Sequence, residues 1–83
     1  MSKFDDLYNE LEEISKELLS YYDVDKVKPY SVYVWTKGEY GENVFDIQAD
    51  EIVFYVEDHV IIKEAEPIIE RIKLKLIEIE RSI

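Results

Sequence analysis

The sequence predicts a two-layer α+β fold in which two antiparallel helices pack on one face of a four-stranded antiparallel meander. Three observations lead to this prediction. One apolar stripe with helical spacing occupies the first quarter of the chain, a second occupies the last quarter, and the segments between them are rich in β-branched and aromatic residues. With 83 residues, the chain is expected to form one domain, residues 1–83, in the order α-β-β-β-β-α.

The first helix is expected to begin after Ser2, a favourable N-cap, and to end near Tyr22. Its apolar residues recur at intervals of three and four and therefore share one face: Phe4, Leu7, Leu11, Ile14, Leu18 and Tyr21. The segment Asp23-Val24-Asp25, followed by Pro29, is expected to close this helix off.

Four strands are expected at residues 30–36, 43–48, 52–57 and 59–63, because these segments carry most of the β-branched and aromatic side chains. Gly38 and Gly41 mark a long first turn, and Asp58 marks a tight third turn. The register that places apolar residues opposite one another pairs Val32 with Ile47, Val34 with Phe45, Phe45 with Phe54, Ile47 with Ile52, and Val56 with Val60. The inner face then holds Tyr30, Val32, Val34, Phe45, Ile47, Ile52, Phe54, Val56, Val60 and Ile62.

The second helix is expected to follow the last strand directly, with Glu66 and Pro67 in its first turn. Its stripe consists of Ala65, Ile69, Ile72, Leu76, Ile79 and Ile83. Two helical stripes suffice to cover one sheet face, so the other face is expected to stay open. We therefore expect a partner-binding surface formed by Tyr33, Trp35, Val44, Asp46, Glu51, Val53, Tyr55, Glu57 and Ile61.

Charge restricts the kind of partner. Twenty Asp and Glu against ten Lys and Arg give a formal net charge of -10, which repels phosphate backbones and anionic membrane surfaces. We therefore expect a basic protein partner, with no direct nucleic-acid binding and no membrane association.

The charged fraction of 36% is typical of thermophiles. The lack of cysteine fits a reducing cytoplasmic setting, and the N-terminus shows neither a targeting segment nor an apolar run of membrane-spanning length.

No catalytic constellation is evident in the sequence. The chain has one histidine and no cysteine, which argues against serine- or cysteine-based nucleophilic catalysis. The segment Gly38-Glu39-Tyr40-Gly41 lacks a following Lys-Ser or Lys-Thr, so it is interpreted as a hairpin loop and not as a phosphate cradle. Glu57, Asp58 and His59 are metal-ligand types, but strand neighbours point to opposite faces. We expect no enzymatic activity, no cofactor and no bound metal.

Two functional hypotheses remain. The first is a non-enzymatic, homodimeric interaction module that binds a basic protein, in one form as an inhibitor whose carboxylates mimic nucleic-acid phosphates. The alternative is a small enzyme or ligand-binding protein with a pocket around Tyr33, Asp46, Tyr55 and His59. For Asp46, a hydrogen bond from a tyrosine hydroxyl is a simpler role than acid/base catalysis. A flat, paired outer face would favour the first hypothesis, and a concave, open face would favour the second.

Overall fold

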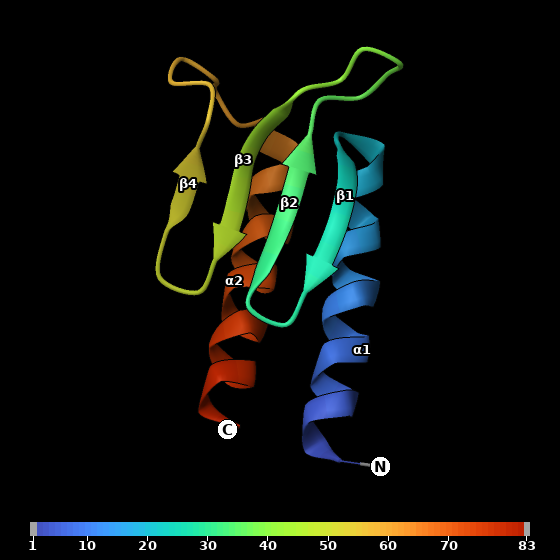
Figure 1. Ribbon diagram of the computed structural model, residues 1–83, viewed down its shortest axis with the longest axis vertical. Coiled ribbons are helices and arrows are strands. Elements are labelled where there is room, and N and C mark those ends of the chain that lie inside the picture. Colours follow the sequence, from blue (N-terminus) through green and yellow to red (C-terminus); the bar gives the residue numbers. More distant parts are fainter. Residues whose placement is uncertain (1, 83) are drawn as a thin grey trace.

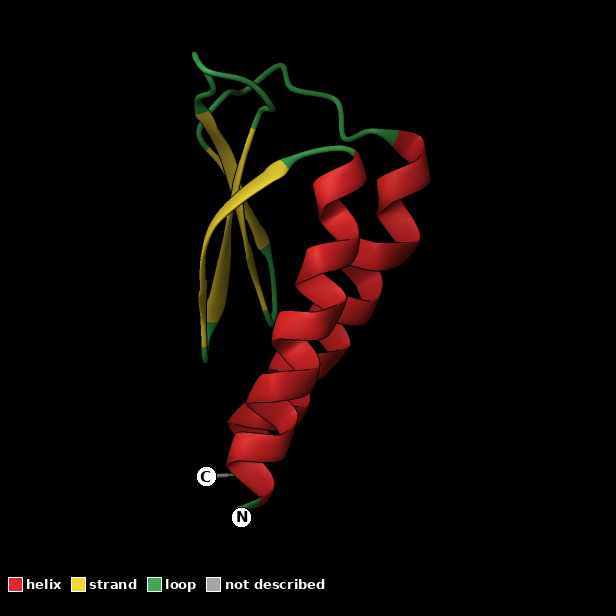
Figure 2. Cartoon of the chain, turned by 90° about the vertical axis from the view of Figure 1, so that its right-hand side faces the viewer, coloured by secondary structure: helices red, strands yellow, loops and turns green. Residues whose placement is uncertain are grey.

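A computed structural model describes residues 2–82 and confirms the α+β fold, with a four-stranded antiparallel sheet and two helices (Figure 1). The strands are β1 (Asp23–Lys28), β2 (Ser31–Trp35), β3 (Asn43–Gln48) and β4 (Ile52–Phe54), and they lie in sequence order across the sheet. Both helices lie on the same side of the sheet, which leaves its other side uncovered by them (Figure 2). The fold therefore has two layers.

The helices run antiparallel, as expected (Figure 1). Helix α1 (Lys3–Lys16) is capped by the Ser2 hydroxyl, which accepts a hydrogen bond of 3.2 Å from the Asp5 amide, and it continues as a 3₁₀ helix over Glu17–Ser20. Helix α2 (Glu66–Arg81) follows a 3₁₀ turn at Lys63–Ala65, and Pro67 lies in its first turn. The predicted stripe residue Ile83 lies outside the described residues.

The core lies between the sheet and the helices. Its fully or almost fully buried side chains are Leu7, Leu11, Leu18, Tyr22, Val32, Val34, Val44, Phe45, Ile47, Ala49, Ala65, Ile69, Ile72, Leu76 and Ile79. The predicted pairings of Val32 with Ile47, Val34 with Phe45, Phe45 with Phe54 and Ile47 with Ile52 are all present. Apolar matching across the central strands was thus sufficient to set their register, because a slip of one residue would expose every inward side chain.

Strand β1 was not predicted, because residues 23–28 were expected only to close the first helix. The strand pairs with β2, and a register shift between Val24 and Lys26 leaves Asp25 as an extra, bulged residue. The bulge places the inward residues Val24 and Val27 three positions apart instead of two, which hides the strand alternation. Because the outward residues are charged, the segment also lacks the composition of a strand.

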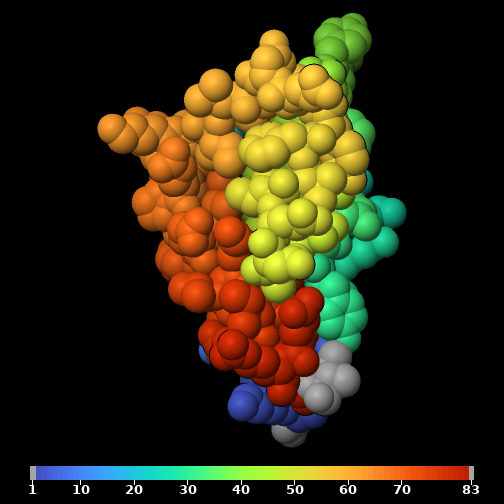
Figure 3. Space-filling view, turned by 90° about the vertical axis from the view of Figure 1, so that its left-hand side faces the viewer, coloured from blue at the N-terminus to red at the C-terminus, as the bar shows by residue number. Residues whose placement is uncertain are grey.

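The predicted fourth strand at residues 59–63 is wrong. After Phe54 the chain turns, and no strand pairing follows before α2 within the described residues. The predicted pairing of Val56 with Val60 is absent from the sheet, and Val60 is 84% exposed. The backbone amide of Ile62 instead donates a hydrogen bond of 3.0 Å to the Tyr22 hydroxyl. The segment crosses from the sheet edge to α2 and packs beside it (Figure 3).

Three residues assigned to the inner face are exposed. Tyr30 lies in the turn between β1 and β2, and Val60 lies in the segment that is not a strand. Phe54 pairs with Phe45 as predicted but is 41% exposed, because β4 is an edge strand of only three residues. Burial therefore falls off towards this edge of the sheet.

Candidate functional site

The candidate site is the outer face of the sheet, the side opposite the helices (Figure 2). Cross-strand pairing places Tyr33 beside Asp46, and Asp46 beside Val53. Tyr33, Trp35 and Val53 are half-buried, and Tyr55, just beyond β4, is exposed. These four apolar side chains belong to the predicted partner-binding surface.

Four other predicted residues do not fit this surface as expected. Val44 is 1% exposed and belongs to the core, because a register shift places Asn43 opposite Trp35. Ile61 packs against the core from a segment that is not a strand. Glu51 and Glu57 are exposed but lie at opposite ends of β4, so they do not form one acidic rim.

Asp46 is buried, and its carboxylate is engaged by neighbouring side chains. The Tyr55 hydroxyl donates a hydrogen bond of 2.7 Å to Oδ2, and the Asn43 amide donates one of 3.4 Å to Oδ1. The bond to Asp46 raises the pKa of Tyr55, since the phenol would lose its acceptor and face a negative charge on ionising. The hydrogen bond expected from a tyrosine is thus present, and it gives Asp46 a structural role.

His59 does not join the residues around Asp46. Its Nε2 lies 2.8 Å from the hydroxyl of the buried Tyr22, and its ring contacts Tyr22 and Phe45, which both belong to the core. Because Phe45 and Asp46 are strand neighbours, their side chains point to opposite faces. The predicted pocket of Tyr33, Asp46, Tyr55 and His59 therefore brings together the first three residues but not the histidine.

A cavity of about 310 Å³ opens at the end of the outer face where β2 leads into the following loop. It is lined by Asp23, Val24, Asp25, Trp35, Thr36, Gly38, Glu39 and Gly41. Its volume is at the lower end of the range of about 300–1,000 Å³ found for small-molecule sites. The outer face is therefore neither flat nor uniformly apolar.

The loop over this cavity has a defined conformation. The Thr36 amide donates to the Glu42 carbonyl, and the Thr36 hydroxyl accepts from the Glu42 amide, which closes the loop at its base. Gly38 has a φ of 112°, a conformation that side-chain-bearing residues rarely adopt, and a Cβ at Gly41 would clash with the Thr36 carbonyl. The two glycines that marked a turn in the sequence thus shape one wall of the cavity.

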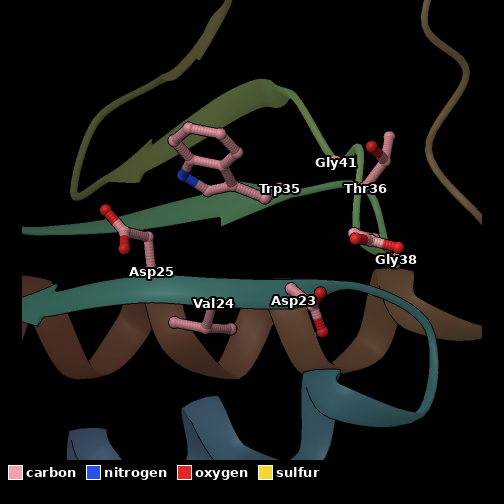
Figure 4. A pocket seen from close by; sticks show the side chains of 8 residues that line it. Asp23, Val24, Asp25, Trp35, Thr36, Gly38 and Gly41 are labelled. Atoms are coloured by element: carbon pink, nitrogen blue, oxygen red, sulfur yellow. The ribbon is translucent and has the colours of Figure 1, made fainter.

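Trp35 belongs to the predicted partner-binding surface and also lines the cavity. Figure 4 shows its indole on the same side of the strands as the Asp25 carboxylate, with the indole nitrogen at the ring edge nearest Asp25. This Nε1 atom is buried and has no hydrogen-bond partner among the described residues.

The cavity is acidic. Asp23, Asp25 and Glu39 contribute three carboxylates, and its eight lining residues include no Lys or Arg. The nearby Lys37 is turned away, with its ammonium donating to the Leu19 carbonyl at 2.7 Å. The ion pairs found within residues 2–82 all join residues of the helical layer, so none of them neutralises this cavity.

From the sequence, Asp23 and Asp25 were interpreted as solvated residues at the end of the first helix, because β1 was not recognised, and Glu39 was assigned to a hairpin loop. The one available signal was the alternation of charged residues with Val24 and Val27, which the bulge at Asp25 interrupts.

Within residues 2–82, no group of three or more His, Cys, Asp or Glu side chains has a geometry suited to a metal ion. The helices of this part of the chain are too short or too polar to cross a bilayer.

Comparisons with known proteins add no assignment: no family model, no curated protein and no solved structure matches the chain. What can be inferred about function therefore comes from the outer face itself.

Proposed function

We propose that this protein is a non-catalytic interaction module that binds a basic protein partner through the outer face of its sheet. The observation that carries the proposal is the half-buried aromatic surface of Tyr33 and Trp35, which no helix covers and which borders an acidic cavity. Aromatic side chains supply much of the energy at interface centres, and complementary charge around them favours one class of partner.

The charge distribution supports a cationic partner. The net charge of -10 gives a field that attracts basic proteins over a distance of about 10 Å at moderate salt. In the helical layer, Arg71 pairs at 2.7 Å with Glu17 of the 3₁₀ helix, and Lys75 pairs at 2.9 Å with Glu10 of α1, so both cations are engaged by carboxylates. An inhibitor that presents carboxylates where a partner normally binds phosphates is one specific form of this function.

The enzyme alternative has less support. Both oxygens of Asp46 accept hydrogen bonds from side chains, and His59 lies towards the core with Tyr22. A general acid or base needs access to a substrate proton, which this arrangement does not provide. If Asp46→Asn abolished turnover of a small substrate, this part of the proposal would be wrong.

The proposal is tested by measuring association with a basic protein, such as a histone or a ribosomal protein, at several salt concentrations. We expect the association rate to fall steeply with salt while the dissociation rate changes little, and Tyr55→Ala to speed dissociation. Tyr40→Ala, in a side chain that is 93% exposed at the loop, serves as the control. Binding to DNA or RNA at physiological salt, or the lack of binding to any basic protein, would contradict the proposal.

The homodimer expected from the sequence belongs to the same proposal, since a second copy can occupy the outer face when no partner is bound. Lys26 and Lys28 lie on β1 towards one end of this face, and Asp23 and Asp25 lie towards the other. A two-fold axis that lies between the two faces, perpendicular to the strands, would place the basic end of one copy against the acidic end of the other. Light scattering that reports a monomer at high concentration would exclude this dimer.

A further inference from the structure

The cavity beside Trp35 has the composition of a site for a cation. Trp35 offers an aromatic ring, and the Asp25 carboxylate lies on the same side of the strands as this ring (Figure 4). The lining also includes Asp23 and Glu39, and none of the three carboxylates forms an ion pair within residues 2–82. Aromatic rings attract cations through their faces, and tryptophan does so most strongly. The same fold already shows this chemistry nearby, where the Lys28 ammonium lies 5.2 Å from the centre of the Tyr33 ring.

The cavity is suited to a side chain rather than to a larger ligand. Its volume of about 310 Å³ is at the small end for ligand sites. It lies at the end of an open sheet face, so a segment of a partner that crosses the face can insert one side chain here (Figure 4). Phosphate-containing ligands are disfavoured by the three carboxylates and by the lack of Lys or Arg in the lining.

We propose, on the basis of the function proposed above, that the outer face docks a basic segment of the partner and that the Trp35 cavity takes an arginine side chain of that segment. A guanidinium is planar, stacks on an indole and presents several N–H donors to carboxylates on either side. An ammonium makes the same charge interaction but cannot stack as a plane. Arginine is therefore favoured over lysine at this position.

Trp35 also provides the readout, because it is the only tryptophan of the chain and its emission reports directly on the cavity. The probes are a short peptide of alternating arginine and serine, its lysine analogue, and its citrulline analogue, which keeps the shape of arginine without the charge. We expect the arginine peptide to change Trp35 emission at the lowest concentration, the lysine peptide to bind more weakly, and the citrulline peptide to have no effect.

Variants then locate the binding. Asp25→Asn is expected to weaken arginine-peptide binding about 3- to 5-fold, the upper part of the range for an exposed ion pair, and Asp25→Asn with Glu39→Gln about 10-fold. Glu70→Gln removes the same charge from an exposed position on α2 and is expected to change affinity less than about 2-fold, because salt screens distant charges. Circular dichroism establishes that each variant is folded.

Three outcomes would overturn the inference, and they are distinguishable. If Asp25→Asn and Glu70→Gln weaken binding equally, the peptide responds to overall charge, and the cavity assignment fails while the proposed function stands. Equal binding of the arginine and citrulline peptides would also remove the cavity assignment. If the unmodified protein binds neither basic peptides nor basic proteins, the proposed function fails as well.

Discussion

Replacement of Tyr22 by phenylalanine tests the position of the segment between the sheet and α2. Tyr22 is 2% exposed, and its hydroxyl accepts the Ile62 amide at 3.0 Å and lies 2.8 Å from Nε2 of His59. The substitution keeps the ring and its edge contact with Phe45, whose centroid is 5.4 Å away, and removes only the oxygen. Any loss of stability therefore comes from these two hydrogen bonds.

The expected cost of Tyr22→Phe is about 2 kcal/mol in the free energy of unfolding. Each hydrogen bond contributes about 0.5–1.5 kcal/mol, and the Ile62 amide is left without its acceptor in a partly buried position. For a domain of this size, 1 kcal/mol corresponds to about 4–8 °C in melting temperature, so a decrease of about 8–16 °C is expected. The loss should appear in both thermal and denaturant unfolding.

Tyr40→Phe is the matched control, because it deletes the same hydroxyl from a side chain that is 93% exposed. Its effect should stay within about 0.5 kcal/mol. If Tyr22→Phe were as mild as this control, the hydroxyl would not hold the segment at residues 59–62. Such a result would favour a hairpin that pairs Val56 with Val60.

Three further predictions concern the sheet and the charges. Phe45→Ala is expected to cost about 3–5 kcal/mol and Phe54→Ala about 1–2 kcal/mol in denaturant unfolding, because Phe45 is fully buried and Phe54 is 41% exposed. An NMR titration of the tyrosine rings should show the pKa of Tyr55 above its ordinary value and lowered by Asp46→Asn, since the bond to Asp46 favours the protonated phenol. Moderate salt should raise the melting temperature, because the net charge of -10 makes self-repulsion larger than the attraction in the surface ion pairs.

Each of these predictions has a contrary outcome. If Phe45→Ala and Phe54→Ala reduced the free energy of unfolding equally, β4 would be an interior strand and not an edge strand. The raised pKa of Tyr55 also determines how this hydrogen bond contributes to stability at different pH. The Tyr55–Asp46 bond stabilises the fold at pH values below the pKa of tyrosine in the unfolded chain. This contribution is lost as the pH rises through the pKa of Tyr55 in the folded protein. A Tyr55 pKa that Asp46→Asn leaves unchanged would therefore contradict the hydrogen bond. A melting temperature that falls with salt would mean that attractive pairs outweigh repulsion.

The candidate site could be predicted only in part. Tyr33, Trp35, Val53 and Tyr55 were found because strand alternation separates an inner from an outer face, and that alternation is visible in the sequence. Val44 and Ile61 were assigned wrongly, because a register shift and an unpaired segment changed which way they face. The acidic lining of the cavity was not predicted: Asp23 and Asp25 were assigned to the end of the first helix and Glu39 to a hairpin loop, and they line one cavity only when β1 pairs with β2.

The sequence by itself determined the fold class, the two helices, the register of the central strands and the acidic character of the protein. These features depend on periodicity and composition, which are local and can be read along the chain. Only the tertiary structure decided which four segments form the sheet, because a charged edge strand with a bulge is stabilised by pairing with β2 and not by its own residues. It also decided that His59 contacts Tyr22, 37 positions away in the chain, and that three carboxylates and Trp35 line one cavity. These contacts join residues that are far apart in the sequence, so no local sequence pattern predicts them.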